Sequence, residues 1–75
     1  MNKQRRKWLA DVISQLEEKR DELWNIYEDE EMAYDNLPES LQESDRGITM
    51  QDNMGTIEDV YNDLDNLIES LNELI

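Results

Sequence analysis

Residues 36–47, NLPESLQESDRG, contain the sequence signals for a turn in this 75-residue chain. They include Pro38, the only proline in the sequence. Proline has no backbone N–H and disfavours helical geometry in the residue before it, so a helix should end just ahead of it. Asn36 is a suitable N-cap for a new helix, and Glu39 stands where a capping box needs it. A stop and restart within about three residues predicts an all-α antiparallel helical hairpin whose turn covers residues 36–38.

Upstream of this turn, apolar residues recur at helical spacing from Trp8 onward. They form three neighbouring seven-residue rows, and a charged residue takes one place in each row. The rows are Leu9, Leu16, Leu23, Glu30 and Leu37; Val12, Lys19, Ile26 and Ala33; and Ile13, Arg20, Tyr27 and Tyr34. This stripe predicts an amphipathic helix of about 30 residues, extending from about residue 3 to residue 35.

Downstream of the turn, a second helix is expected from about residue 38 to residue 75. Its first half is weak, because Gly47 and Gly55 each cost about 1 kcal/mol relative to alanine in a helix interior. A break within residues 44–55 is therefore compatible with the sequence. From Thr56 onward the apolar pattern is strong, and it is wider than the seam that one facing helix covers. Its members are Ile57, Val60, Tyr61, Leu64, Leu67, Ile68, Leu71, Leu74 and Ile75.

The width of this stripe, together with the small size of the chain, predicts self-association. A chain this short buries its apolar surface poorly alone. The sequence contains no cysteine and no histidine, which excludes disulfides and removes the commonest metal ligand. We therefore expect a homo-oligomeric coiled-coil bundle, most simply a dimer forming a four-helix bundle. The candidate interface residues are Ile57, Tyr61, Leu64, Ile68, Leu71 and Ile75.

The net charge of -13 is unevenly distributed along the chain. Residues 1–20 carry six basic and three acidic side chains, whereas residues 21–75 carry seventeen acidic side chains and only one basic one, Arg46. Residues 21–75 are therefore strongly negative, so they should repel nucleic acid and membrane surfaces and attract a basic partner. The hairpin should also bring the basic segment Lys3–Lys7 beside the acidic residues 63–75, where unlike charges would meet.

No apolar run approaches the roughly 18 residues that a membrane span needs. The basic start MNKQRRKWLADVI is interrupted by Asp11 and has no small-residue cleavage site, so a signal peptide is not expected. We therefore expect a soluble, cytoplasmic protein.

Three residues near the turn are candidates for a ligand or partner site: Glu30, Tyr34 and Arg46. Glu30 takes a seam position, where a carboxylate needs a partner or a proton unless it leans out into water. Arg46 is a candidate partner for Glu30 if the fold brings it back across the turn. Arg46 is alternatively able to hold an anionic ligand with help from free N–H groups at a helix start, or to tie down its own loop.

The sequence contains no recognisable set of catalytic residues. It has no Ser/His or Cys/His set and no glycine-rich phosphate loop, so we predict no catalysis and no cofactor. The acidic run EDEEMAYD, residues 28–35, places carboxylates on common helix faces. Without histidine or a calcium-loop spacing, a solvated acidic face is the simpler interpretation of this run, and no metal site is predicted.

The segment EEMAYDNLPESLQESDRG, with NKQRRK at the start and IEDVYNDLDNLIESLNELI at the end, resembles a family of small acidic helical proteins of bacteria and phages. That family shares an NLPESLQ-S-RG core and has no assigned activity. The resemblance implies a helical hairpin and a phage or mobile-element setting, and it implies no function. The chain departs from the family pattern at Gly55 and QDNM, where better helix formers are expected.

Three functions are compatible with these features. The favoured one is a non-catalytic interaction protein, an oligomeric acidic hairpin that binds another protein and, in a phage setting, inhibits a basic host factor. The second is a nucleic-acid mimic whose acidic rows occupy the groove of a basic DNA-binding protein. The third is a sponge for a small anionic nucleotide, held between subunits by Arg46, Tyr34 and the basic N-terminal cluster. Few positive charges are available to line such a pocket.

Overall fold

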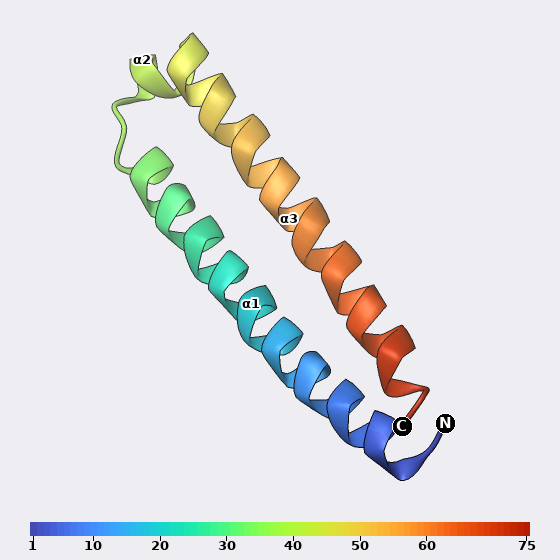
Figure 1. Ribbon diagram of the computed structural model, residues 1–75. Coiled ribbons are helices and arrows are strands. Elements are labelled where there is room, and N and C mark those ends of the chain that lie inside the picture. The colour runs from blue at the N-terminus through green and yellow to red at the C-terminus, as the bar shows by residue number, and fades with distance from the viewer.

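The computed structural model describes residues 1–75 and is a single helical hairpin (Figure 1). Helix α1 comprises Lys3–Asp35, the short α2 comprises Glu39–Gln42, and α3 comprises Asp45–Asn72. Helices α1 and α3 lie side by side and antiparallel, with both termini at one end and α2 at the other. The Cα atoms fill a rod of 58 × 15 × 12 Å. The prediction of an all-α hairpin is therefore confirmed.

None of the three helices combines the length and the apolar character that a membrane span requires.

The turn after α1 is built differently from the prediction. Asn36 was expected to cap the second helix, but it ends the first one, with φ -82° and ψ -8° and its N–H donated to the Met32 carbonyl at 3.1 Å. Pro38 takes the N-cap position of α2 and makes no side-chain hydrogen bond there. The capping box between Asn36 and Glu39 is therefore not formed, because proline at the cap position has no polar side chain.

The remainder of the chain forms two helices, so the break that the sequence allowed within residues 44–55 is present, at the first residue of that range. Helix α2 is a single turn, and the chain changes direction at Glu43 and Ser44 before α3 begins. The Ser44 hydroxyl donates to the Leu41 carbonyl and holds this corner. From Asp45 to Asn72 the helix is continuous, so residues 45–55 are helical and the interruption lies just before them.

Gly47 explains how α2 and α3 can meet so closely. It lies in the first turn of α3 and is buried. A Cβ atom at this position would overlap the carbonyl oxygen of Gln42 and lie 2.7 Å from its Cα. Gly55 differs, because a Cβ added there meets no atom within 4 Å. The two glycines thus have different physical roles, and only Gly47 is required by packing.

The seam between α1 and α3 follows alternating spacings of three and four residues. This is the heptad pattern of a coiled coil. All sixteen seam residues are buried or half-buried. They are Leu9, Ile13, Leu16, Arg20, Leu23, Tyr27, Glu30 and Tyr34 on α1, and Gly47, Met50, Met54, Ile57, Tyr61, Leu64, Ile68 and Leu71 on α3. Position a is taken by Ile13, Arg20, Tyr27 and Tyr34 of α1 and by Gly47, Met54, Tyr61 and Ile68 of α3, and the other seam residues take position d. Only Ile13 and Ile68, each 3% exposed, are fully buried apolar residues.

The seam divides the remaining surface of the rod into two broad faces. In an antiparallel pair, the e positions of both helices flank one side of the seam and the g positions flank the other. We call the side with the e and neighbouring b positions the polar face, and the side with the g and neighbouring c positions the apolar face. The f positions form the backs of the two helices, which point away from the seam.

Alanine substitutions at the two glycines test this description of the corner. Gly47→Ala should lower the free energy of unfolding by about 2 kcal/mol, because the new methyl group forces α2 and α3 apart. Gly55→Ala should raise it by about 1 kcal/mol, because alanine is the better helix former at an open position. Urea denaturation followed by far-UV circular dichroism measures both changes. A Gly47→Ala protein as stable as the wild type would contradict the close approach.

Candidate functional site

The polar face carries the contacts that connect α1 to α3 outside the apolar seam. Each of them joins one seam residue to one residue at an e position. They are the ion pair from Arg20 Nη1 to Asp65 Oδ1 at 2.8 Å, the Trp24 and Tyr61 rings with centroids 4.9 Å apart, and the bond from Gln51 Nε2 to the Tyr34 hydroxyl at 2.8 Å. These contacts hold the two helices in one register.

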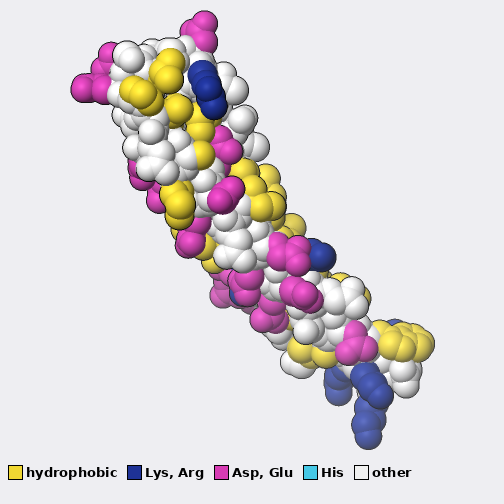
Figure 2. Space-filling view, turned by 90° about the vertical axis from the view of Figure 1, so that its left-hand side faces the viewer, with side chains coloured by type: hydrophobic (Ala, Val, Ile, Leu, Met, Phe, Trp, Pro, Cys, Tyr) yellow, Lys and Arg dark blue, Asp and Glu magenta, His cyan; other side chains and the backbone are white.

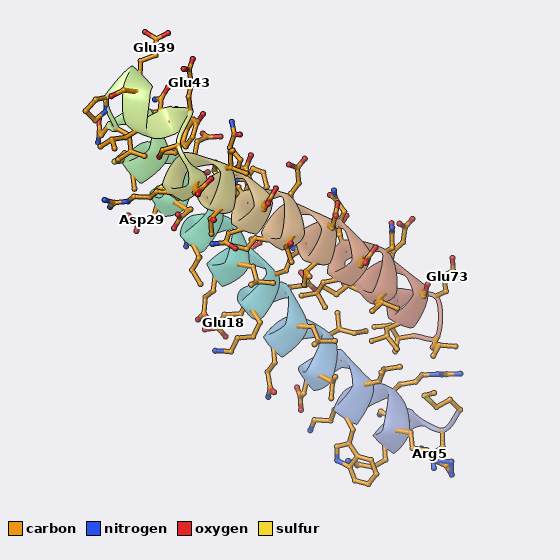
Figure 3. The ribbon with its side chains drawn as sticks, turned by 90° about the horizontal axis from the view of Figure 1, so that it is seen from above. Arg5, Glu18, Asp29, Glu39, Glu43 and Glu73 are labelled. Atoms are coloured by element: carbon orange, nitrogen blue, oxygen red, sulfur yellow. The ribbon has the colours of Figure 1, made fainter.

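Most acidic side chains lie on the polar face and on the backs of the helices. Fourteen of the twenty occupy e, b or f positions: Asp11, Glu17, Glu18, Asp21, Glu28, Glu31, Asp35, Asp45, Asp52, Glu58, Asp59, Asp65, Glu69 and Glu73. In Figure 3, Glu18 and Glu73 point away from the hairpin, as do Glu39 and Glu43 at the turn. The sorting makes one side of the rod strongly negative.

A hollow of about 490 Å³ lies on the polar face, near the turn end of α1. We call it the aromatic hollow; its lining residues are Trp24, Tyr27, Glu28, Glu31, Met32, Asp35 and Asn36. Trp24 and Tyr27 stack with centroids 4.6 Å apart and ring planes only 10° from parallel, and Trp24 also rests against Tyr61. An aromatic surface bordered by carboxylates is therefore presented to solvent.

The spacing on α1 explains why these groups converge. Trp24, Glu28, Glu31 and Asp35 follow one another at intervals of four, three and four residues, which places them in one row along a helix. Aromatic ring faces attract cations, and carboxylates accept charge-assisted hydrogen bonds from ammonium or guanidinium groups. The hollow is thus suited to an organic cation. No three side chains of metal-ligating type converge on a common point anywhere in the chain.

The environment of the hollow also changes the chemistry of Tyr27. Burial raises the pKa of its phenol, and the negative charges of Glu31 and Glu58 raise the pKa further. Glu31 comes from the same helix, whereas Glu58 comes from α3. The phenol therefore stays protonated to higher pH than a free tyrosine and remains a neutral hydrogen-bond donor in the hollow.

A second, smaller hollow of about 260 Å³ lies further along the polar face. Its centre is Arg20, a cation in the seam that pairs with Asp21 at 3.2 Å and with Asp65 at 2.8 Å. Burial alone would lower the pKa of Arg20, but hydrogen bonds to these two carboxylates raise it. Because its charge is already neutralised from both helices, Arg20 serves the hairpin and leaves little capacity for a ligand.

The structure does not bring together the three site residues proposed from the sequence. Tyr34 is half-buried; its hydroxyl accepts from Gln51 and its carbonyl accepts from Gln42 Nε2 at 3.0 Å. Glu30 is half-buried in the seam without a hydrogen bond or ion pair, and Arg46 is exposed in the first turn of α3 without one. The expected Glu30–Arg46 pair is absent. Tyr34 bonds to Gln51, so Arg46 lies more than one helical turn further along α3, beyond the end of α1.

The candidate interface residues on α3 also need correction. Five of them lie in the α3 half of the seam, where the hairpin buries Ile68 and half-buries the other four: Ile57, Tyr61, Leu64 and Leu71. Ile75 remains 51% exposed at the end of the chain. Three further apolar residues after Thr56 stay open: Val60, Leu67 and Leu74, which are 46%, 60% and 51% exposed. Along the sequence the two rows form one wide apolar stripe, and the spacing does not show which row α1 covers.

The basic N-terminal cluster, Lys3, Arg5, Arg6 and Lys7, makes no ion pair. The expected pairing with residues 63–75 is thus not formed. Since Arg20 lies opposite Asp65, the first turns of α1 extend past the end of α3, and Arg5 points away from the rod in Figure 3. Figure 2 shows the same basic group projecting from this end. Four cations are therefore available at one tip of the molecule.

No family model, curated protein or solved structure matches this chain.

The raised pKa of Tyr27 predicts a measurable titration. With Tyr34→Phe and Tyr61→Phe in place, phenolate absorbance should show Tyr27 titrating above the ordinary value of about 10, and Glu31→Gln should lower the midpoint. Because the folded pKa is the higher one, this contribution to stability is complete below pH ~10 and is lost as the pH rises through the folded pKa. A midpoint equal to that of free tyrosine would contradict the described environment.

The carboxylate of Glu30 is half-buried and unpaired, so we expect it to lower the free energy of unfolding. Glu30→Leu should raise the free energy of unfolding by about 1 kcal/mol, because an apolar side chain would fill the half-buried position. Glu18→Leu, at an exposed f position of the same helix, is the matched control and should change little. Urea denaturation compares the two variants, and equal effects would show that Glu30 does not contribute to the seam.

Proposed function

We propose that this protein is a non-catalytic interaction protein, an acidic helical hairpin that assembles with itself and binds a basic protein through its polar face. The observation that carries this proposal is the aromatic hollow. The stacked rings of Trp24 and Tyr27 supply a surface for a lysine or arginine side chain. Glu28, Glu31 and Asp35 border the same hollow and can accept its hydrogen bonds.

The magnitudes favour a protein partner with several basic residues over a single small cation. One cation on an exposed aromatic ring gains only about 0.5–1 kcal/mol. The acidic residues along the rest of the polar face would add further contacts and speed encounter with a positively charged surface. Binding should weaken as salt screens these charges. The proposed partner is therefore a protein that inserts one basic side chain into the hollow and lays a basic surface beside it.

In the phage or mobile-element setting that the resemblance of the central motif implies, we propose that this partner is a host factor in the cytoplasm. Occupying the basic surface of such a factor would inhibit it. The proposal needs no catalytic step, because binding alone blocks the surface.

A second candidate is a nucleic-acid mimic, favoured by the fourteen acidic side chains that follow both helices over most of the 58 Å rod. In that case the partner's DNA-binding groove would contact the whole negative surface, and no single hollow would dominate. A nucleotide sponge is less favoured, because residues 28–46 around its proposed site carry eight acidic side chains against Arg46 alone.

A binding experiment with an oligoarginine peptide separates the first two candidates. In a Trp8→Phe background, the fluorescence of Trp24 reports directly on the hollow. Glu31→Gln with Asp35→Asn should weaken peptide binding about tenfold, since two charge-assisted hydrogen bonds to the cation are lost. The matched control, Asp59→Asn with Glu73→Gln, removes the same charge at exposed positions outside the hollow and should change the affinity less than about twofold.

Equal weakening in both double variants would show that binding follows net charge alone, which would favour the mimic. If oligoarginine does not bind at low ionic strength, the proposal of a basic partner is wrong.

A further inference from the structure

The apolar face is the least charged and most hydrophobic part of the surface. Its exposed apolar side chains, between 46% and 60% open to solvent, are Trp8, Val12, Ile26, Val60, Leu67 and Leu74. Each occupies a g or c position, so the row runs along both helices on the side opposite the aromatic hollow. Figure 2 shows hydrophobic side chains gathered along one edge of the rod, reaching toward the end with the basic cluster.

The charges on this face cancel. Its basic residues are Arg5, Lys19 and Arg46, and its acidic residues are Glu22, Asp29 and Asp63. Lys19 and Glu22 already pair with each other at 3.1 Å. The chain's net charge of -13 is therefore carried entirely elsewhere. A second copy could cover this face without bringing its own excess of negative charge into contact with that of the first.

We propose that the apolar face docks a second copy of this chain in antiparallel order. The inference rests on the self-assembly part of the proposed function and specifies its face and direction. The charge at the two ends of the rod determines the direction. The tip with the termini carries the four unpaired cations of the basic N-terminal cluster, whereas residues 28–46 carry eight acidic side chains against Arg46 alone.

Antiparallel order places the basic tip of each copy near the acidic turn end of the other. Parallel order would bring four cations against four cations and eight carboxylates against eight, which costs free energy at low salt. On α1 the apolar face repeats the same order, with Arg5 and Lys19 in the first half and Glu22 and Asp29 in the second.

The dimensions fit such a contact. A contact along the whole rod, 58 Å long and 12–15 Å wide, would provide roughly the 800 Å² per partner that a stable interface buries. The exposed apolar side chains of the apolar face themselves end at Ile26 and Val60, short of the turn. The second copy would also complete the core, since one hairpin alone fully buries only Ile13 and Ile68 among its apolar side chains. In the resulting four-helix bundle, the two aromatic hollows would face outward on opposite sides and near opposite ends. The assembly would then be bivalent for a basic partner.

The direction is testable by one label, because the chain contains no cysteine. Ser40→Cys places a spin label on α2, at an exposed position of the turn end. Electron–electron distance measurement then reports only the separation between copies. Antiparallel order predicts about 50 Å, close to the length of the rod, whereas parallel order predicts a distance below roughly 20 Å. The shorter distance would overturn the proposed direction.

The face is testable by adding charge to it. Val60→Glu with Leu67→Glu changes two exposed residues, so the hairpin should keep its helical circular dichroism while the dimer dissociation constant rises at least about tenfold. The matched control, Asn62→Glu with Asn66→Glu, adds the same charge at exposed b and f positions and should stay dimeric. Sedimentation equilibrium compares both with the wild type.

The outcomes separate this inference from the proposal on which it rests. A wild-type dimer that survives Val60→Glu with Leu67→Glu would show self-assembly through another surface, which would overturn the inference alone. A wild-type chain that is monomeric at about 100 μM, a hundredfold above a micromolar dissociation constant, would overturn both the inference and self-assembly. The apolar face would then be open to a different occupant, and the oligoarginine experiment would still test the aromatic hollow independently.

Discussion

The heptad seam between α1 and α3 stabilises both helices and sets their register, which in turn places every other side chain on the surface. Helices of this length gain most of their stability in proteins by packing an apolar stripe against a neighbour. Here the stripe is continuous on both helices except at Arg20, Glu30 and Gly47. Each exception has a local cause or consequence. Arg20 is neutralised across the seam by Asp65, Gly47 admits the α2–α3 corner, and Glu30 remains without a partner.

The same seam also organises the surface. Once the register is set, e positions from both helices share one face and g positions share the other, so residues far apart in the chain acquire common surroundings. The phenol of Tyr27 is influenced by Glu58 for this reason, and Trp24 rests against Tyr61. The polar face collects the carboxylates and the aromatic hollow, whereas the apolar face balances its charges and leaves six large hydrophobic side chains exposed. A molecule with two such different faces can assemble on one and bind on the other.

Charge is separated along the rod as well as across it. The basic N-terminal cluster extends past the end of α3, and the acidic turn lies at the other tip. Neither group is neutralised within one hairpin, because all three ion pairs involve Lys19 or Arg20 near the middle of α1. This lengthwise polarity is what makes an antiparallel pair of hairpins electrostatically favourable. It also leaves the net negative charge on the outer surfaces, where a basic partner would meet it.

The extent of α1 and the hairpin follow from local sequence features, because seven-residue apolar rows and the restriction before Pro38 act over short distances along the chain. The sequence also contains the row Trp24, Glu28, Glu31 and Asp35, but spacing along one helix does not distinguish this row from a solvated acidic face. Three features follow only from the packing of the helices. They are the apolar row that α1 covers, the need for glycine at position 47, and the lack of a contact between Arg46 and Glu30. These outcomes depend on the register of two distant segments and on the angle between α2 and α3. No local propensity encodes that register or that angle, since both emerge only when the two helices pack.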